Sequence, residues 1–136
     1  MTNNKARVLV VDDEPVVRMS YTRSLAAEFD AYTAPDGEQA LREMEREPAD
    51  VVLLDLRLPG AQGLEVLQAM KRNWPETEVV VITGYPGVDS AKQAVRLGAA
   101  DYLAKPVGPN EVMSAARNAL VRKHWTLRIQ PERTFS

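Results

Sequence analysis

The sequence of 136 residues contains no cysteine. This absence excludes a disulfide scaffold, a thiolate zinc site and a cysteine nucleophile. No uninterrupted apolar run approaches the roughly 18 residues of a membrane span, and residues 1–5 (MTNNK) lack the apolar core of a signal peptide. We therefore expect a cytoplasmic protein that has no membrane partner.

Positive charge is not in excess either. Lys and Arg number 17 against 19 Asp and Glu, which gives a formal net charge of -2. Proteins that bind nucleic-acid phosphates exploit a basic excess, so we expect no direct nucleic-acid binding by this chain. The remaining composition, 45% hydrophobic and 26% charged, is that of an ordinary globular protein. The length fits one domain of roughly 100 to 200 residues.

Short β-branched apolar runs alternate with helical patterns, which is typical of a parallel sheet covered on both faces. The predicted strands are residues 7–11, 31–34, 51–54, 79–82 and 102–104. The first, third and fourth consist almost entirely of Val, Leu and Ile and should form the buried centre. Five strand-helix units are too few for an eight-stranded barrel. The sequence therefore predicts a flavodoxin-like, doubly wound five-stranded parallel sheet of order 2-1-3-4-5 with five helices.

The helices are expected from local start and stop signals. Pro15 and Pro109 suit the first turns of the first and fifth helices, and Asp36 and Asp89 are expected to cap the second and fourth. Gly98 offers a left-handed position after the fourth helix. The apolar stripes are Val17, Tyr21 and Leu25; Ala40, Leu41 and Met44; Leu64, Leu67 and Met70; and Val112, Ala116 and Leu120.

The C-terminal segment has a different character. Residues 125–136 lose the helical period and contain Pro131. We expect residues 1–124 to form the domain. Residues 125–136 would be a tail, or the start of a linker to an output domain beyond Ser136.

Charged or hydroxyl side chains stand directly after four of the predicted strands: Asp12 and Asp13, Asp55, Thr83 and Lys105. Ligands of open parallel sheets bind beyond the carboxyl ends of the strands, and the order 2-1-3-4-5 would gather these groups there. Three carboxylates in one place need a compensating cation. An all-oxygen set suits Mg²⁺, with Mn²⁺ as a substitute, and Mg²⁺ often completes its coordination with phosphate oxygens. A phosphorylated ligand is therefore implied.

These motifs closely resemble the receiver domains of two-component response regulators, over about residues 7–123. The matching segments are Asp12-Asp13, residues 55–63 (DLRLPGAQG), Thr83-Gly84 and residues 102–106 (YLAKP). Residues 81–85 (VITGY), together with Lys105-Pro106, are similar to receivers fused to transcriptional activators that serve the alternative sigma factor fifty-four.

The resemblance implies that Asp55 attacks the phosphorus of a phosphohistidine and becomes an aspartyl phosphate. The donor would be a sensor histidine kinase or a histidine phosphotransfer protein. Asp12, Asp13, Asp55 and the backbone carbonyl of Arg57 would hold Mg²⁺. The chain would catalyse only its own phosphorylation and autodephosphorylation, so it would not be a conventional enzyme, and phosphorylation would allow a homodimer.

The resemblance also assigns the cationic and switching residues. Lys105 would pair with Asp55 and then with the phosphoryl group, and the Lys105–Pro106 bond would be cis. The Thr83 hydroxyl would move toward the phosphoryl group, and Tyr102 would turn inward as Thr83 vacates space. Asp55, Thr83 and Lys105 would thus be the catalytic residues, and Thr83 and Tyr102 the switch.

Tyr85 is a further candidate, because it lies two residues after Thr83 at the mouth of the inferred site. We hypothesise that it shields the acyl phosphate from water.

Other functions fit the residues less well. A phosphorylation-independent, receiver-like interaction module usually lacks an acidic residue or the lysine, and this chain keeps both; that alternative stays open. A phosphatase of the haloacid dehalogenase type needs an acid-base aspartate two positions after its nucleophile, where this chain has Arg57. A flavin carrier would need a Ser/Thr/Gly-rich phosphate loop after the first strand, and none is found.

Overall fold

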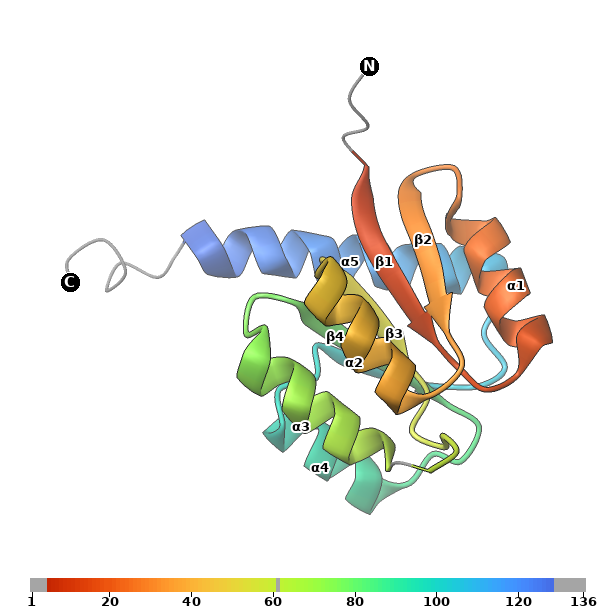
Figure 1. Ribbon diagram of the computed structural model, residues 1–136, viewed down its shortest axis with the longest axis vertical. Coiled ribbons are helices and arrows are strands. Elements are labelled where there is room, and N and C mark those ends of the chain that lie inside the picture. Colours follow the sequence, from red (N-terminus) through yellow and green to blue (C-terminus); the bar gives the residue numbers. More distant parts are fainter. Residues whose placement is uncertain (1–4, 61, 129–136) are drawn as a thin grey trace.

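Five parallel strands form one sheet in the order β2-β1-β3-β4-β5 (Figure 1). The structure, a computed structural model, describes residues 5–60 and 62–128. The strands are β1 (Ala6–Val11), β2 (Phe29–Ala34), β3 (Val51–Leu54), β4 (Glu78–Thr83) and β5 (Asp101–Ala104). The predicted fold class and strand order are therefore confirmed, and β2 begins two residues earlier than residue 31.

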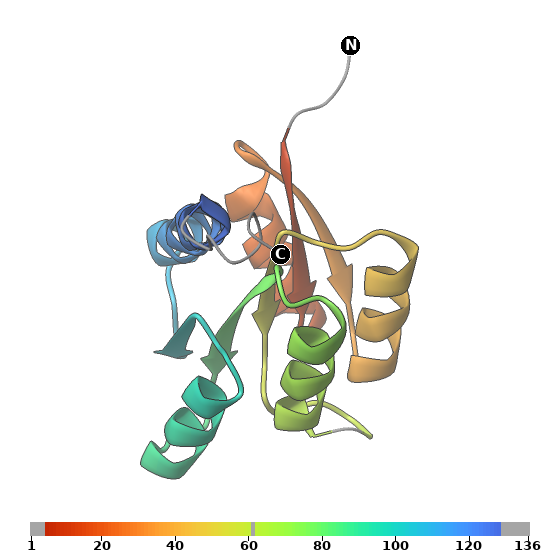
Figure 2. The ribbon, with the colours of Figure 1, turned by 90° about the vertical axis from the view of Figure 1, so that its left-hand side faces the viewer.

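Helices cover both faces of this sheet. They are α1 (Pro15–Leu25), α2 (Gly37–Arg46), α3 (Gly63–Asn73), α4 (Val88–Arg96) and α5 (Pro109–Arg128). Buried residues of α1 and α5 belong to one apolar cluster, and those of α2, α3 and α4 belong to the other. Figure 2 shows α1 and α5 on one side of the strands and α2 and α3 on the other.

The double cover explains why the central strands are continuously apolar. In β1, Val8 and Val10 join the cluster beneath α1 and α5, whereas Leu9 and Val11 join the opposite cluster. Alternate side chains point to opposite faces, so a strand buried on both needs an apolar residue at every position. As predicted, β1, β3 and β4 are the buried centre.

The helix signals predicted most of the ends. Pro15 occupies the first turn of α1, and the Asp36 side chain caps α2 by accepting the Gln39 N–H at 2.8 Å. Gly98 follows α4 with a left-handed φ of 99°. The prediction for Asp89 is wrong, because Gly87 is the N-cap of α4 and Asp89 lies in the first turn. Its negative charge there still suits the positive end of the helix dipole.

The end of α5 differs from the expected tail. The helix continues to Arg128, so residues 125–128, expected to have lost the helical period, are helical. Residues 129–136 of the predicted tail lie outside the described residues, and the domain boundary at residue 124 stays a prediction. Among the helices of residues 5–60 and 62–128, none combines the length and apolar character needed to cross a membrane.

Gly63 anchors the loop that carries the residues after β3. Its N–H donates to the Leu56 carbonyl at 3.1 Å. A Cβ atom on Gly63 would lie 2.3 Å from the Leu56 Cα atom, which is a backbone clash. The start of α3 and this loop can therefore approach so closely only with glycine at position 63.

Gly63→Ala should lower the free energy of unfolding by about 1 to 3 kcal/mol, since backbone must shift to accept the methyl group. Urea unfolding monitored by circular dichroism measures this loss. Gly84→Ala is the control, because a Cβ there meets only the flexible Lys105 Cδ, at 3.8 Å. Equal stability of the two variants would contradict the steric explanation.

Candidate functional site

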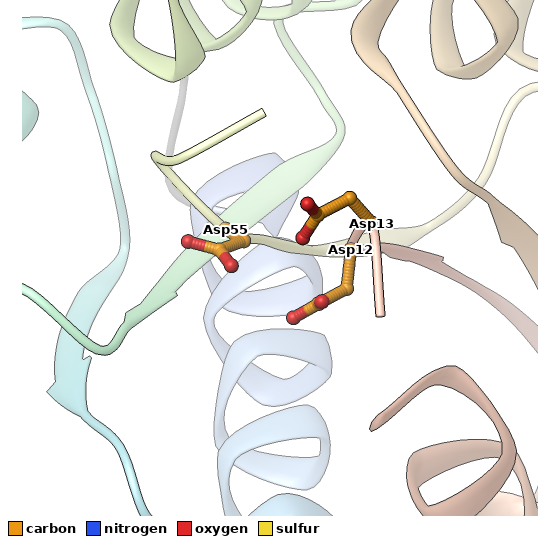
Figure 3. A group of neighbouring side chains, drawn as sticks. All are labelled: Asp12, Asp13 and Asp55. Atoms are coloured by element: carbon orange, nitrogen blue, oxygen red, sulfur yellow. The ribbon is translucent and has the colours of Figure 1, made fainter. Parts of the chain in front are cut away.

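Strand register brings Asp12 and Asp55 together. Val11 of β1 pairs with Leu54 of β3, so the residues that follow them emerge side by side at one edge of the sheet. The Asp55 N–H donates to the Val11 carbonyl at 3.0 Å and extends this alignment. Carboxylate oxygens of Asp12, Asp13 and Asp55 all lie within 4.8 Å of one another (Figure 3). The predicted acidic cluster is thus assembled.

The three carboxylates are held differently. Asp12 and Asp55 are buried, with relative exposures of 2% and 5%, whereas Asp13 is exposed. Oδ1 of Asp12 accepts the Glu14 N–H at 2.9 Å, and Oδ1 of Asp55 accepts the Arg57 N–H at 3.0 Å. These turns fix the two buried carboxylates. Asp13 is left as the solvent-facing member.

Lys105 reaches the cluster from β5. Ala104 pairs with Thr83 of β4, and the peptide bond that follows Lys105 is cis, as expected. The Lys105 Nζ lies 3.0 Å from Asp55 Oδ2, as the resemblance implied, and 2.7 Å from Asp12 Oδ2. The contact with Asp12 was not predicted.

Burial and charge work against each other in this cluster. Burial raises the pKa of Asp55 above its ordinary value, although hydrogen bonds from the Arg57 N–H and Lys105 partly offset it. Burial also disfavours the charge on Lys105, but its bonds to Asp12 and Asp55 outweigh this effect and raise the pKa of the ammonium. We conclude that Lys105 stays protonated at neutral pH.

The charge count fits a divalent cation. Three carboxylates and one ammonium leave an excess of two negative charges where the oxygens converge. Hard cations such as Mg²⁺ prefer such oxygen ligands. The cluster of carboxylate oxygens therefore suits a divalent cation. The Arg57 carbonyl remains a predicted ligand.

Thr83 and Tyr102 both contact the β4–α4 loop. Thr83 is fully buried, and its Oγ1 accepts the Tyr85 N–H at 3.1 Å. The Tyr102 hydroxyl lies 2.6 Å from Ser90 Oγ and accepts the Gly87 N–H at 3.3 Å. Ser90 was missed by the sequence analysis, because a serine in the first turn of a helix gives no local sign of a bond to a tyrosine twelve residues away.

The mouth of the site is crossed by a second unpredicted contact. The Arg57 guanidinium carbon lies 3.9 Å from the centre of the Tyr85 ring, which is cation-π geometry. Both residues line a cavity of about 620 Å³, together with Asp13, Asp55 and Lys105. Tyr85 therefore lies at the cavity beside Asp55, as hypothesised, and its ring contacts Arg57 in the loop that follows β3.

Comparison with known proteins agrees with this geometry. The family described as response regulator receiver domain matches residues 8–117. The chain is 36% identical over 130 residues to the alginate biosynthesis transcriptional regulatory protein AlgB of Pseudomonas syringae pv. tomato. That match covers 95% of this chain and 29% of AlgB.

Solved structures share the fold. NtrX from Brucella abortus superposes with a TM-score of 0.87 at 31% identity, over 95% of this chain and 30% of that chain. A structure described as the BeF3-activated receiver domain of DrrB gives a TM-score of 0.80 at 28% identity, over 85% and 97% of the two chains. DrrB is from Thermotoga maritima. The present chain thus spans less than a third of AlgB and of NtrX.

Lys105→Met should lower the free energy of unfolding by about 1 to 3 kcal/mol in buffer free of divalent cations, because two buried carboxylates lose their cation. Adding Asp55→Asn should recover part of the loss by removing one of those charges. Urea unfolding of the single and double variants measures both effects, with Lys92→Met on exposed α4 as the control. If the change in the free energy of unfolding of the double variant equals the sum of the changes in the two single variants, Lys105 does not act through Asp55.

Proposed function

Because the chain belongs to the response regulator receiver domain family, whose members are phosphorylation-dependent switches, we propose that Asp55 is its phosphoryl-accepting residue. The observation that supports this most directly is the position of Asp55. Its buried carboxylate lies within 4.8 Å of two others, contacts the Lys105 ammonium and faces an open cavity.

Mg²⁺ is the proposed cofactor, with Mn²⁺ as a substitute. Asp12, Asp13, Asp55 and the backbone carbonyl of Arg57 would hold it. A bound Mg²⁺ would neutralise charge on the phosphoryl oxygens during transfer. The excess of two negative charges in the cluster supports this assignment.

In the proposed reaction an Asp55 carboxylate oxygen attacks the phosphorus atom of a phosphohistidine. The O–P bond forms as the N–P bond breaks, and the histidine nitrogen leaves with the electron pair. Lys105 faces the carboxylate and would neutralise a phosphoryl oxygen. Phosphoryl transfer depends mainly on such positioning and charge neutralisation, so the chain needs no separate general base.

The conformational change would start at Thr83. A phosphoryl group adds about 1.5 to 2 negative charges and three acceptor oxygens. It would draw the Thr83 hydroxyl away from the Tyr85 N–H, and Tyr102 would turn into the vacated space. A phosphorylated chain would thereby shift between two arrangements of the β4–α4 loop and α4.

Partners and output are inferred from relatives. The phosphoryl donor would be a sensor histidine kinase or a histidine phosphotransfer protein, encountered in the cytoplasm. AlgB is described as a transcriptional regulatory protein and is much longer than this chain, which supports an output domain that regulates transcription. We propose the sigma factor fifty-four activator type, and a homodimer of the phosphorylated form.

Incubation with acetyl phosphate and Mg²⁺ should add the mass of one phosphoryl group to the intact chain. Asp55→Asn should abolish the added mass, because the amide is not a nucleophile, and Asp89→Asn on exposed α4 should retain it. Intact-mass spectrometry measures the added mass in the wild-type chain and in both variants. A wild-type chain that stays unmodified would favour the phosphorylation-independent interaction module instead.

Tyr85→Ala should shorten the lifetime of the aspartyl phosphate severalfold, since the Tyr85 ring and the stacked Arg57 line the cavity beside Asp55 and would hinder the approach of water. Loss of the added mass with time, after removal of the donor, measures this lifetime. Val88→Ala is the control, because this exposed residue follows the same loop but does not line the cavity. An unchanged or longer lifetime in Tyr85→Ala would exclude shielding.

A further inference from the structure

The Tyr102 hydroxyl takes part in a closed ring of three hydrogen bonds. Ser90 Oγ donates to the Gly87 carbonyl at 3.1 Å, which uses the only hydroxyl proton of the serine. Either oxygen can donate in the 2.6 Å contact between the two hydroxyls, and Tyr102 is the donor when the Ser90 proton lies on the Gly87 carbonyl. The Gly87 N–H donates to Tyr102 at 3.3 Å and closes the ring. The Gly87 carbonyl also accepts the Ala91 N–H, at 3.0 Å, in the first turn of α4.

This ring lies at the N-terminal end of α4. The N-cap of the helix is Gly87, so no side chain at that position caps the first turn. Ala94 is the buried residue of α4, whereas Val88 and Val95 are 71% and 65% exposed. With so little apolar contact, the hydrogen bonds to Tyr102 are a substantial part of what fixes the helix start on β5.

The same loop is held at its other end by Thr83. The Tyr85 N–H donates to Thr83 Oγ1, and Gly87 follows two residues later. Both residues of the proposed switch thus restrain one short loop, Thr83 at its beginning and Tyr102 at its end. Releasing the first restraint leaves the ring as the second barrier to movement.

We propose that Ser90 is a positioning residue that sets the threshold of the switch, an inference that rests on the proposed function. The ring belongs to the arrangement in which Thr83 accepts the Tyr85 N–H. Inward rotation of Tyr102 breaks both bonds made by its hydroxyl, so the ring opposes activation. Removing the Ser90 hydroxyl should make the phosphoryl-bound arrangement easier to reach.

Beryllium fluoride with Mg²⁺ is the probe, as a phosphoryl analogue, and the amide signals of Thr83 and Gly87 in NMR spectra report its binding. Ser90→Ala should lower the half-saturating concentration by about threefold to tenfold, the range for one net hydrogen bond. Ser90→Thr keeps the hydroxyl and should restore the wild-type value. Ser114→Ala, on the exposed face of α5, should change nothing.

Tyr102→Phe tests the ring from its other side. It should lower the half-saturating concentration at least as much as Ser90→Ala, because it removes both bonds made by the Tyr102 hydroxyl. Adding Ser90→Ala to Tyr102→Phe should give no further change, because the bond between the two hydroxyls is already lost. An unchanged or raised value in Ser90→Ala, or effects that multiply in the double variant, would overturn the role of Ser90. A wild-type chain that does not respond to beryllium fluoride would instead refute the proposed phosphoryl site.

Discussion

The ammonium of Lys105 is the contact on which the site depends. It lies between Asp12 and Asp55, so it joins the ends of β1, β3 and β5 through one positive charge. The two buried carboxylates repel each other, burial raises the pKa of Asp55, and a single lysine compensates for only part of their charge. The remaining negative charge destabilises the fold but attracts a divalent cation. The same uncompensated charge therefore lowers the stability of the fold at this edge of the sheet and provides the cation binding that the proposed chemistry needs.

Much of the fold and the positions of the site residues could be predicted because both follow from burial. Strands covered on two faces must be continuously apolar, so β1, β3 and β4 stand out, and a polar residue directly after them marks the sheet edge. Element ends were less predictable. Asp89 is a good capping residue, but α4 begins at Val88 with Gly87 as its N-cap, and the Gly87 N–H donates to the Tyr102 hydroxyl.

Contacts between side chains far apart in sequence were not predictable. The pair of Lys105 with Asp12 and the stacking of Arg57 on Tyr85 depend on rotamers and loop paths that no local spacing encodes. Family resemblance assigns a role to Lys105 but not its second carboxylate partner. Ser90 is a similar case, since a serine in the first turn of a helix most often only contacts its own backbone.

The direction of the switch follows from the relative strengths of the bonds at Thr83. A neutral hydrogen bond contributes about 0.5 to 1.5 kcal/mol, whereas one to a charged group contributes about 1.5 to 3 kcal/mol. A phosphoryl group on Asp55 would therefore outcompete the Tyr85 N–H for the Thr83 hydroxyl. Each bond of the ring at Ser90 is neutral and of the same modest strength as the bond lost at Thr83, and rotation of Tyr102 breaks two of them. The ring therefore shifts the equilibrium between the two arrangements of the loop away from the phosphoryl-bound one.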